Sequence, residues 1–250
     1  MKIKFLGTNG WFSTATGGTT CAAVVLSDRL IVLDAGEGLY KVPKVAKEGG
    51  ISKTDIFISH LHLDHTIGLH TLPLFRKGCT VRLLVHKSYV KSLHTLLNHP
   101  YTASASQLWA KLDIVPLKQG PNLLPYKVTV LPLRHADPSW GFRFEFDGKT
   151  IAYCADTGPC ENLARLADKA DAFITECALQ PGAPELRGWP HLSPEMAAMA
   201  AKKAAAKRLV LTHFDAVRYK TLQARLAAEK AAKKIFNSSQ AAYDGFVVSI

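Results

Sequence analysis

The chemistry of this chain is decided by one stretch of its sequence, Ile56-Phe57-Ile58-Ser59-His60-Leu61-His62-Leu63-Asp64-His65. The stretch begins as an apolar run typical of a buried strand and ends in three histidines and an aspartate. In an extended backbone, residues two apart point to the same side, so His60, His62 and Asp64 are expected to face one way and His65 another. Imidazole and carboxylate groups suit Zn²⁺ and similar divalent ions. The stretch therefore predicts two nearby metal ions, one bound by His60 and His62 and the other by Asp64 and His65.

Outward from this stretch, short apolar runs between turn signals predict further strands. They lie at residues 2–6, 21–26, 30–33, 81–85, 128–133, 142–146, 150–154, 208–212 and 246–250. The dipeptide Asp147-Gly148 predicts a hairpin turn. Ser193-Pro194-Glu195 combines an N-cap residue with a first-turn proline and carboxylate, which predicts a helix reaching Lys207. A second helix is expected over residues 221–234.

Two segments carry weaker signals. Residues 116–125 contain Gly120, Pro121 and Pro125, and we interpret them as a surface loop because the segment is too short for a linker between domains. Residues 1–250 are therefore predicted to form one domain. Residues 86–101 contain three histidines without an assigned role, which are expected on a helix surface or overhanging the site: His86, His94 and His99.

The composition is that of a globular protein. The 250 residues are 48% hydrophobic and 20% charged, and the mean hydropathy is +0.04, which excludes a disordered or fibrous chain. No apolar run approaches the roughly 18 to 20 residues of a membrane-spanning helix, and no signal-peptide core follows the N-terminus. A cytoplasmic protein without membrane contact is expected. The five cysteines form no CxxC pair, and we expect buried, reduced thiols.

The net charge of +11 points to an anionic partner. Much of this charge lies between Pro194 and Ile235, a segment that contains ten Lys and Arg residues but only three acidic residues. Most of these cations fall on predicted helices, so a solvated helix face is the first interpretation and a polyanion-binding surface the second. Charge alone does not make the chain a nucleic-acid-binding protein.

The spacing HxHxDH at residues 60–65 resembles the signature of the metallo-β-lactamase superfamily. The resemblance implies that His135 completes the ligands of the first metal and His213 those of the second. It also implies that Asp156 bridges both metals and that Asp34 is a structural aspartate ending an early strand. The resemblance covers nearly the whole chain and implies an α/β fold of the αββα sandwich type. It further implies two divalent ions at one edge between the sheets, Zn²⁺ or alternatively Mn²⁺.

Two further residues resemble one branch of the superfamily. Glu176 and His191 follow Asp156 by 20 and 35 positions, a layout similar to ribonuclease Z and its phosphodiesterase relatives. There, a glutamate orients a histidine that protonates the leaving group, a role worth about 10²- to 10⁴-fold in rate. A metal-bridging hydroxide would attack phosphorus, with Asp64 accepting a hydrogen bond from it. The alternative is that Glu176 is a surface acid and His191 decorates the entrance of a helix.

The substrate is expected to be small. Many ribonuclease Z proteins carry a long arm for tRNA between the third histidine and the bridging aspartate, but here His135 and Asp156 are only 21 positions apart. The sequence therefore resembles short relatives that hydrolyse cyclic nucleotides, and the resemblance also implies a homodimer. The alternatives are a ribonuclease Z-like nuclease acting on RNA 3′ ends, another small-molecule metallo-hydrolase, and a non-catalytic binding protein of this fold.

Overall fold

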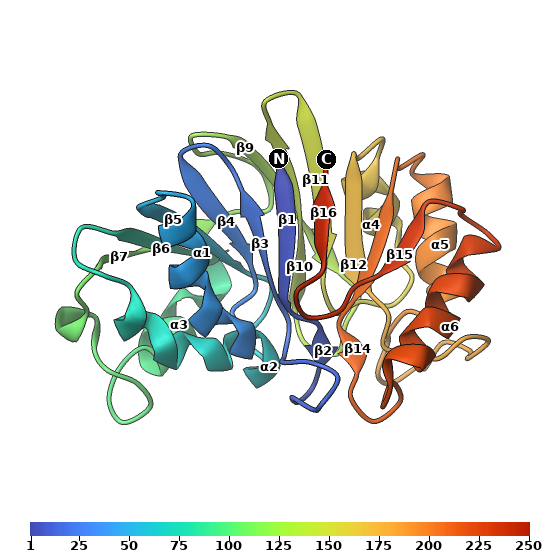
Figure 1. The fold of residues 1–250 in the computed structure, drawn as a ribbon, viewed down its shortest axis with the longest axis horizontal. Coiled ribbons are helices and arrows are strands. Elements are labelled where there is room, and N and C mark those ends of the chain that lie inside the picture. Colours follow the sequence, from blue (N-terminus) through green and yellow to red (C-terminus); the bar gives the residue numbers. More distant parts are fainter.

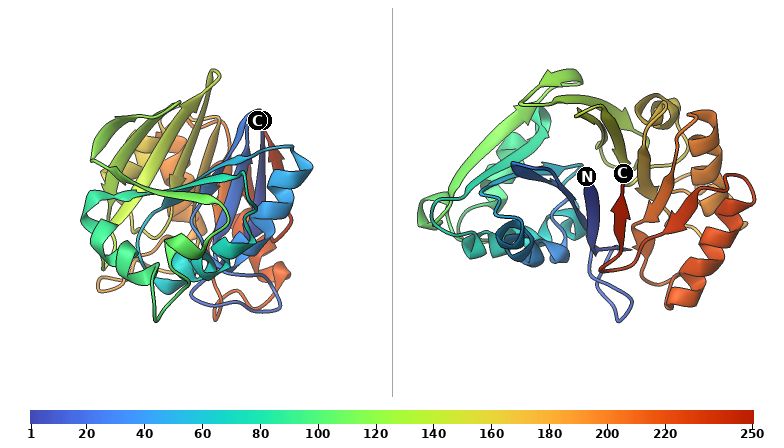
Figure 2. Two further views of the ribbon diagram at one scale, coloured as in Figure 1. Left: turned by 90° about the vertical axis from the view of Figure 1, so that its left-hand side faces the viewer. Right: turned by 45° about the horizontal axis from the view of Figure 1, so that its top comes forward.

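Two β-sheets packed face to face form the centre of the structure, which is a computed structural model describing residues 1–250 (Figure 1). Helices cover the outer face of each sheet, so that the layers run helix, sheet, sheet, helix (Figure 2). Both sheets combine antiparallel hairpins with parallel strands, as expected when helical crossovers alternate with tight turns. The αββα sandwich predicted from the sequence is confirmed.

The first sheet has seven strands in the order β16-β1-β3-β4-β5-β6-β7. Their bounds are β16 Val247–Ser249, β1 Lys2–Gly7, β3 Cys21–Val25, β4 Arg29–Leu33, β5 Lys53–Ile58, β6 Thr80–His86 and β7 Lys111–Leu117. The strands from β16 to β4 pair antiparallel, whereas β4 to β7 run parallel. Since β16 pairs with β1, the two chain termini lie side by side (Figure 1).

The second sheet also has seven strands, in the order β15-β13-β12-β11-β10-β9-β8. Their bounds are β15 Ser239–Ala241, β13 Leu209–Thr212, β12 Ala172–Glu176, β11 Lys149–Cys154, β10 Ser139–Phe146, β9 Lys127–Leu133 and β8 Gly120–Leu123. The strands β8 to β11 form an antiparallel meander, and β11, β12, β13 and β15 run parallel. The predicted hairpin turn at Asp147-Gly148 joins β10 to β11, and both of its residues have positive φ.

Six α-helices cover the sheets, three on each sheet, and an apolar cluster lies between each set of three helices and its sheet. On the first sheet lie α1 Val42–Glu48, α2 Leu63–Thr66 and α3 Val90–Leu96; on the second lie α4 Glu161–Ala167, α5 Pro194–Lys203 and α6 Leu222–Lys233 (Figure 1). Ser193 accepts the hydrogen bond from Met196 N at the start of α5, as its sequence predicts. None of these helices is both long and apolar enough to cross a membrane.

The interior between the sheets is a third apolar cluster of 24 buried residues drawn from both sheets. Phe57 on β5 meets Phe142 and Phe144 on β10 edge to face, with ring centroids 5.3 and 4.8 Å apart. Such aromatic pairs stabilise a fold by more than the burial of their apolar area alone. Because Phe57 lies three residues before His60, this packing also anchors the strand that leads into the site.

A short parallel pair ties the two halves together at the site end of the sandwich. β2 Asn9–Gly10 pairs with β14 Phe214–Asp215, so the N-terminal loop lies against the segment that follows β13. The pair is supported by Arg225 of α6, which is 2% exposed and donates to Thr8 and Asn9. The expectation that the late cations lie on a solvated helix face is therefore wrong for Arg225, whose pKa burial lowers to about 10.

Several elements differ from the sequence-based expectation. The interpretation of residues 116–125 as a loop is wrong, because this segment contains the end of β7 and all of β8. Strand β12 was not predicted, and its apolar face is short and interrupted by Thr175. His86 is not on a helix surface but ends β6, where it is buried and stacked on Trp140 with centroids 3.6 Å apart. The expectation for His94 is confirmed, since it is exposed on α3. The same expectation is wrong for His99, which is exposed in a turn beyond the end of α3 at Leu96.

The extended geometry predicted for residues 60–65 is also wrong. Strand β5 ends at Ile58, and the chain turns into the short helix α2, which carries Asp64 and His65. As a result His65 points into the same cluster as Asp64, with its Nε2 3.5 Å from Asp64 Oδ2. A strand would have sent these adjacent side chains to opposite sides.

We expect Phe57→Ala to lower the free energy of unfolding by about 3–5 kcal/mol, because it leaves a cavity between the sheets. Urea denaturation followed by circular dichroism measures the change. Leu123→Ala is the matched control: Leu123 is 90% exposed, so its truncation is expected to change stability by no more than about 0.5 kcal/mol. Equal effects of the two substitutions would contradict the central role of the aromatic packing.

Candidate metal centre

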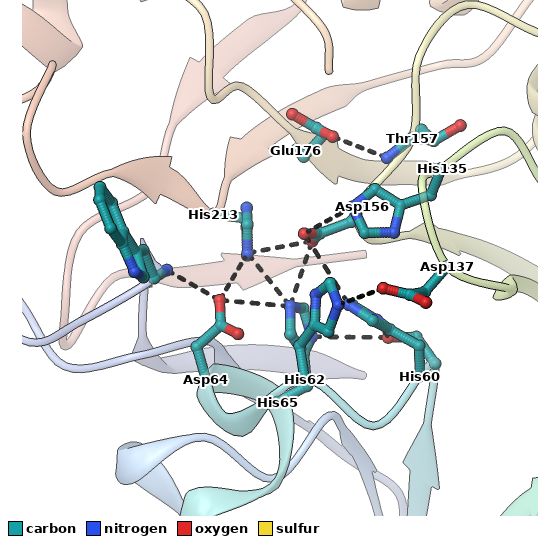
Figure 3. Close-up of polar contacts among 12 residues, drawn as sticks. His60, His62, Asp64, His65, His135, Asp137, Asp156, Thr157, Glu176 and His213 are labelled. Carbon is teal, nitrogen blue, oxygen red and sulfur yellow. Dashed lines mark hydrogen bonds and ion pairs between the residues drawn. The ribbon is translucent and has the colours of Figure 1, made fainter. Parts of the chain in front are cut away.

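Seven histidine and aspartate side chains converge where strands from both sheets end (Figure 3). They follow the carboxyl ends of β5, β9, β11 and β13, which is where open α/β sheets characteristically bind ligands. The residues are His60, His62, Asp64 and His65 after β5, His135 after β9, Asp156 after β11 and His213 after β13. The structure thus brings together every residue predicted from the sequence to bind metal.

The seven residues form two groups in which the potential ligand atoms lie within 4.8 Å of one another. The first group is His60, His62, His135 and Asp156, and the second is Asp64, His65 and His213. These are the two sets that the resemblance implies.

The carboxylate of Asp156 lies between the two groups (Figure 3). Its Oδ1 is 3.1 Å from His65 Nε2 and 3.0 Å from His213 Nε2. Its Oδ2 is 3.9 Å from His60 Nε2 and 3.7 Å from His135 Nε2. One oxygen therefore faces each group, which is the position that a bridging carboxylate requires.

The polar atoms of the cluster fit a divalent cation. Several ring nitrogens are buried without a hydrogen-bond partner: His60 Nε2, both nitrogens of His135 and His213 Nδ1. Each unpaired buried group costs roughly 1–3 kcal/mol, so a concentration of them at one place indicates a ligand. The donors are imidazoles and carboxylates without any thiolate, a set that suits Zn²⁺ and comparable divalent ions.

The charge balance of the cluster also calls for a cation. Burial opposes charge on His213, but Asp156 and Asp64 outweigh it and raise the pKa of His213 to about 10. In the same way, burial is outweighed by the neighbouring carboxylates at His65, whose pKa is raised well above its ordinary value. The protons that these carboxylates attract are what a metal ion displaces, so metal affinity is expected to rise with pH.

Asp34 orients one of the metal-site histidines from beneath. Its Oδ2 accepts a hydrogen bond from His65 Nδ1 at 2.8 Å and from Tyr153 Oη at 2.6 Å, and its Oδ1 accepts one from Ser59 N at 2.7 Å. A carboxylate can only accept here, so the proton of His65 is on Nδ1 and Nε2 is directed at the cluster. These hydrogen bonds are the physical basis of the structural role predicted for Asp34. The backbone of Asp34 also has a positive φ of 57°.

His62 has a carboxylate partner that sequence reasoning missed. Its Nε2 lies 2.9 Å from Asp137 Oδ2, which leaves Nδ1 as the nitrogen available to the first group (Figure 3). The signal was present, because Asp137 follows His135 by two positions. Gly10 was also missed as a packing residue: a Cβ at this position would lie 2.4 Å from the ring of His213. Only glycine lets the N-terminal loop approach that imidazole so closely.

Glu176 and His191 form a buried pair beside the cluster. Glu176 Oε1 is 2.7 Å from His191 Nδ1 and accepts a further hydrogen bond from Thr157 N at 2.7 Å, and Oε2 accepts from Leu192 N. Burial lowers the pKa of His191, but the charge and hydrogen bond of Glu176 outweigh it and raise the pKa. Glu176 is 0% exposed, so the alternative that it is a surface acid is wrong.

The cluster opens into a cavity of about 700 Å³, within the usual size range of small-molecule sites. Its lining includes members of the second group, His191 and two tryptophans, Trp11 and Trp189. Arg218 also lines it and is held by Asp215 at 2.6 Å. His86, His94 and His99 do not line this cavity, so none of them overhangs the site.

The five cysteines take no part in the centre and are all free. Cys21, Cys154 and Cys177 are buried as expected, whereas Cys79 and Cys160 are half-buried.

Comparison with known proteins places this geometry in a family. The family model of the beta-lactamase superfamily domain matches residues 29–214. A ribonuclease Z from Bacillus licheniformis is 30% identical over 304 aligned positions, which cover 98% of this chain and 97% of that protein. Ribonucleases Z from other bacteria and from archaea match as well.

Two solved structures share the fold over their whole length. The metallo-beta-lactamase fold protein YhfI from Bacillus subtilis has a TM-score of 0.81 at 21% identity and covers 99% of both chains. The short form of human tRNase Z has a TM-score of 0.70 at 24% identity and covers 100% of this chain and 99% of that one. The chain belongs to the beta-lactamase superfamily and is a metal-dependent hydrolase with the metallo-β-lactamase fold. Within that superfamily it lies in the ribonuclease Z-like branch.

We expect Asp34→Asn to weaken Zn²⁺ binding by about 10- to 100-fold, because His65 loses the carboxylate that orients it. Asparagine tolerates the positive φ of this position, so the backbone is preserved. Competition with a chromogenic chelator measures the affinity. The matched control is Asp147→Asn, which replaces an exposed aspartate that also has positive φ. An unchanged affinity in Asp34→Asn would contradict the orienting role.

Proposed function

We propose that this protein is a phosphodiesterase that uses two divalent ions, Zn²⁺ in the first place and Mn²⁺ as the alternative, to hydrolyse a small phosphodiester. A cyclic nucleotide is the substrate that we favour. The observation that carries the proposal is the buried Glu176–His191 pair, which lies beside a complete set of metal-binding side chains. A metal site alone suits many hydrolases, whereas the added proton donor suits a reaction with a poor leaving group.

The ligand sets follow from the two groups. His60, His62 and His135 are assigned to the first ion and Asp64, His65 and His213 to the second, with Asp156 shared. When bound, such a pair of ions lowers the pKa of water and neutralises the charge that develops on a phosphate. We assign Asp64 a second role, that of accepting a hydrogen bond from the attacking water. Its Oδ2 is already held by Trp11 N at 2.8 Å, which limits the orientations of the carboxylate.

His191 is assigned the role of proton donor to the departing alkoxide. Its Nδ1 is engaged by Glu176, so Nε2 is the atom left to deliver a proton into the cavity. The carboxylate of Glu176 also favours the protonated imidazole, which is the form that a general acid needs. Glu176 is in turn held by three backbone N–H groups, those of Thr157, Ala178 and Leu192, so the ring of His191 has a fixed direction.

The small size that we propose for the substrate rests on three observations. Between His135 and Asp156 the chain forms only the β10–β11 hairpin, so the interval holds no arm for tRNA. The alignment with ribonuclease Z spans 304 positions against the 250 residues of this chain, so that protein contains segments without a counterpart here. A cavity of about 700 Å³ is large enough for a mononucleotide.

A second candidate is a nuclease that acts on RNA 3′ ends. It is favoured by the 30% identity with a ribonuclease Z over 98% of this chain. The net charge of +11 is compatible with it but equally with a small anion. A homodimer and a cytoplasmic location stay predictions.

A substrate panel separates the two candidates. The zinc-loaded protein is assayed with bis(p-nitrophenyl) phosphate, with 3′,5′-cyclic nucleotides and with a precursor tRNA. We expect hydrolysis of the aryl phosphodiester and of at least one cyclic nucleotide. Cleavage of the precursor at low enzyme concentration, with cyclic nucleotides untouched, would favour the nuclease instead. If none of the three is hydrolysed, the proposed function is wrong.

Replacing His191 separates the proton donor from the metal centre. We expect His191→Ala to reduce kcat by about 10²- to 10⁴-fold with a poor alkoxide leaving group, while the metal content stays unchanged. Asp156→Ala is expected to lose metal, because both groups lose their shared oxygen ligand. Plasma emission spectrometry gives the metal content of each variant. His94→Ala, on the exposed face of α3, is the matched control. Loss of metal in His191→Ala would contradict its assignment as proton donor.

A further inference from the structure

Two of the four tryptophans line the cavity beside the metal cluster and are nevertheless exposed. Trp11 is 68% and Trp189 51% exposed, and both belong to the cavity lining. Trp109 is also exposed, at 71%, but lies outside this cavity, and Trp140 is buried. Exposing a large indole loses the stabilisation that its burial provides, so two of them at one functional cavity indicate a binding surface.

Trp189 is placed against the metal-site histidines. Its indole is parallel to the ring of His62, with an interplanar angle of 3° and centroids 6.0 Å apart. It also meets His135 edge to face at 5.6 Å and lies 6.3 Å from His191. The indole therefore adjoins both the first metal group and the proposed proton donor, within reach of a substituent on a phosphate bound there.

Trp11 approaches the same cavity from the N-terminal loop. Its backbone N–H donates to Asp64 Oδ2, and its φ of 72° lies in the left-handed region, which is unfavourable for a bulky residue. The hydrogen bond to the metal-site carboxylate holds the backbone in this conformation. The indole itself contacts Phe12 edge to face, with centroids 5.3 Å apart. The cavity thus has aromatic side chains beside both metal groups.

The remaining lining indicates which aromatic ligand fits. Arg218 uses Nη1 to bind Asp215, and its other guanidinium nitrogens make no hydrogen bond within the protein. The indole suits a flat aromatic ring, the metal cluster suits an anionic group, and the free guanidinium edge suits hydrogen-bond acceptors. The fitting ligand therefore combines these three features. A nucleotide has these features, and stacking on an aromatic side chain is available to every base.

We propose, on the premise of the phosphodiesterase function above, that Trp189 is the platform on which the nucleobase of a mononucleotide substrate stacks while its phosphate lies at the metal cluster. Trp11 closes the cavity beside Asp64 as a secondary contact. Trp189 thereby selects nucleotides over phosphodiesters that have no planar group. It is a specificity-determining residue and takes no part in proton transfer.

The test compares two ligands that differ only in the base, adenosine 5′-monophosphate and ribose 5-phosphate. Their affinities for the zinc-loaded protein are measured by isothermal titration calorimetry, which needs no turnover. We expect the wild-type protein to bind adenosine 5′-monophosphate about tenfold or more tightly than ribose 5-phosphate. In Trp189→Ala this ratio is expected to fall to near one, with the affinity for ribose 5-phosphate unchanged.

Two further variants serve as controls. Trp189→Phe keeps an aromatic face and is expected to retain most of the preference for the base. Trp109→Ala removes an exposed indole outside the cavity and is expected to leave the ratio at the wild-type value. Circular dichroism and Tm confirm that each variant is folded.

The proposal is wrong if the wild-type protein binds the two ligands equally or binds neither. It is also wrong if Trp189→Ala weakens both ligands by the same factor, or if Trp109→Ala abolishes the preference as well. The outcome of the hydrolysis panel is independent of the outcome of this binding test. Absent hydrolysis with the base preference intact would remove the proposed function and leave a nucleotide-binding cavity, whereas hydrolysis with a ratio near one would remove only the role of Trp189.

Discussion

The carboxylate of Asp156 is the constraint on which the site depends, because it lies within 4 Å of four histidines from both halves of the sandwich. Burying so many polar groups together is unfavourable unless a cation compensates them. The protein supplies an orienting carboxylate, Asp34, beneath His65, and another, Asp137, beside His62. These interactions hold the imidazoles in the positions that metal binding needs before a metal arrives.

The fold delivers these side chains through the ends of strands that are themselves tightly packed. Phe57 packs between the sheets, three residues before His60. At the other side, β2 and β14 bring Gly10 against His213, which has a positive φ of 50°. Buried Arg225 stabilises that contact from α6, so a helix that supplies no metal-site residue takes part in placing one of these side chains.

The metal cluster and the cavity answer different questions about function. The metal cluster bears on how a bond is hydrolysed, and the proton-donor role that we propose for His191 concerns the same step. Selection among phosphodiesters depends instead on what surrounds the phosphate. In this chain two exposed indoles and Arg218 line the cavity beside the metal cluster, and they are the basis for proposing a nucleotide as the substrate.

Most of the strands could be predicted from the sequence because short apolar runs are local patterns, and so could the family, because HxHxDH is a local motif. The resemblance that this motif carries then pointed to His135, Asp156 and His213 as further ligands. The common direction of Asp64 and His65 was not predictable in this way, because the four-residue helix α2 forms where a strand was expected. The burial of Arg225, the strand β8 and the shared cavity of Trp11 and Trp189 likewise emerge only from the folded chain. These features depend on contacts between residues far apart in the chain, and no local pattern specifies which distant segments pack together.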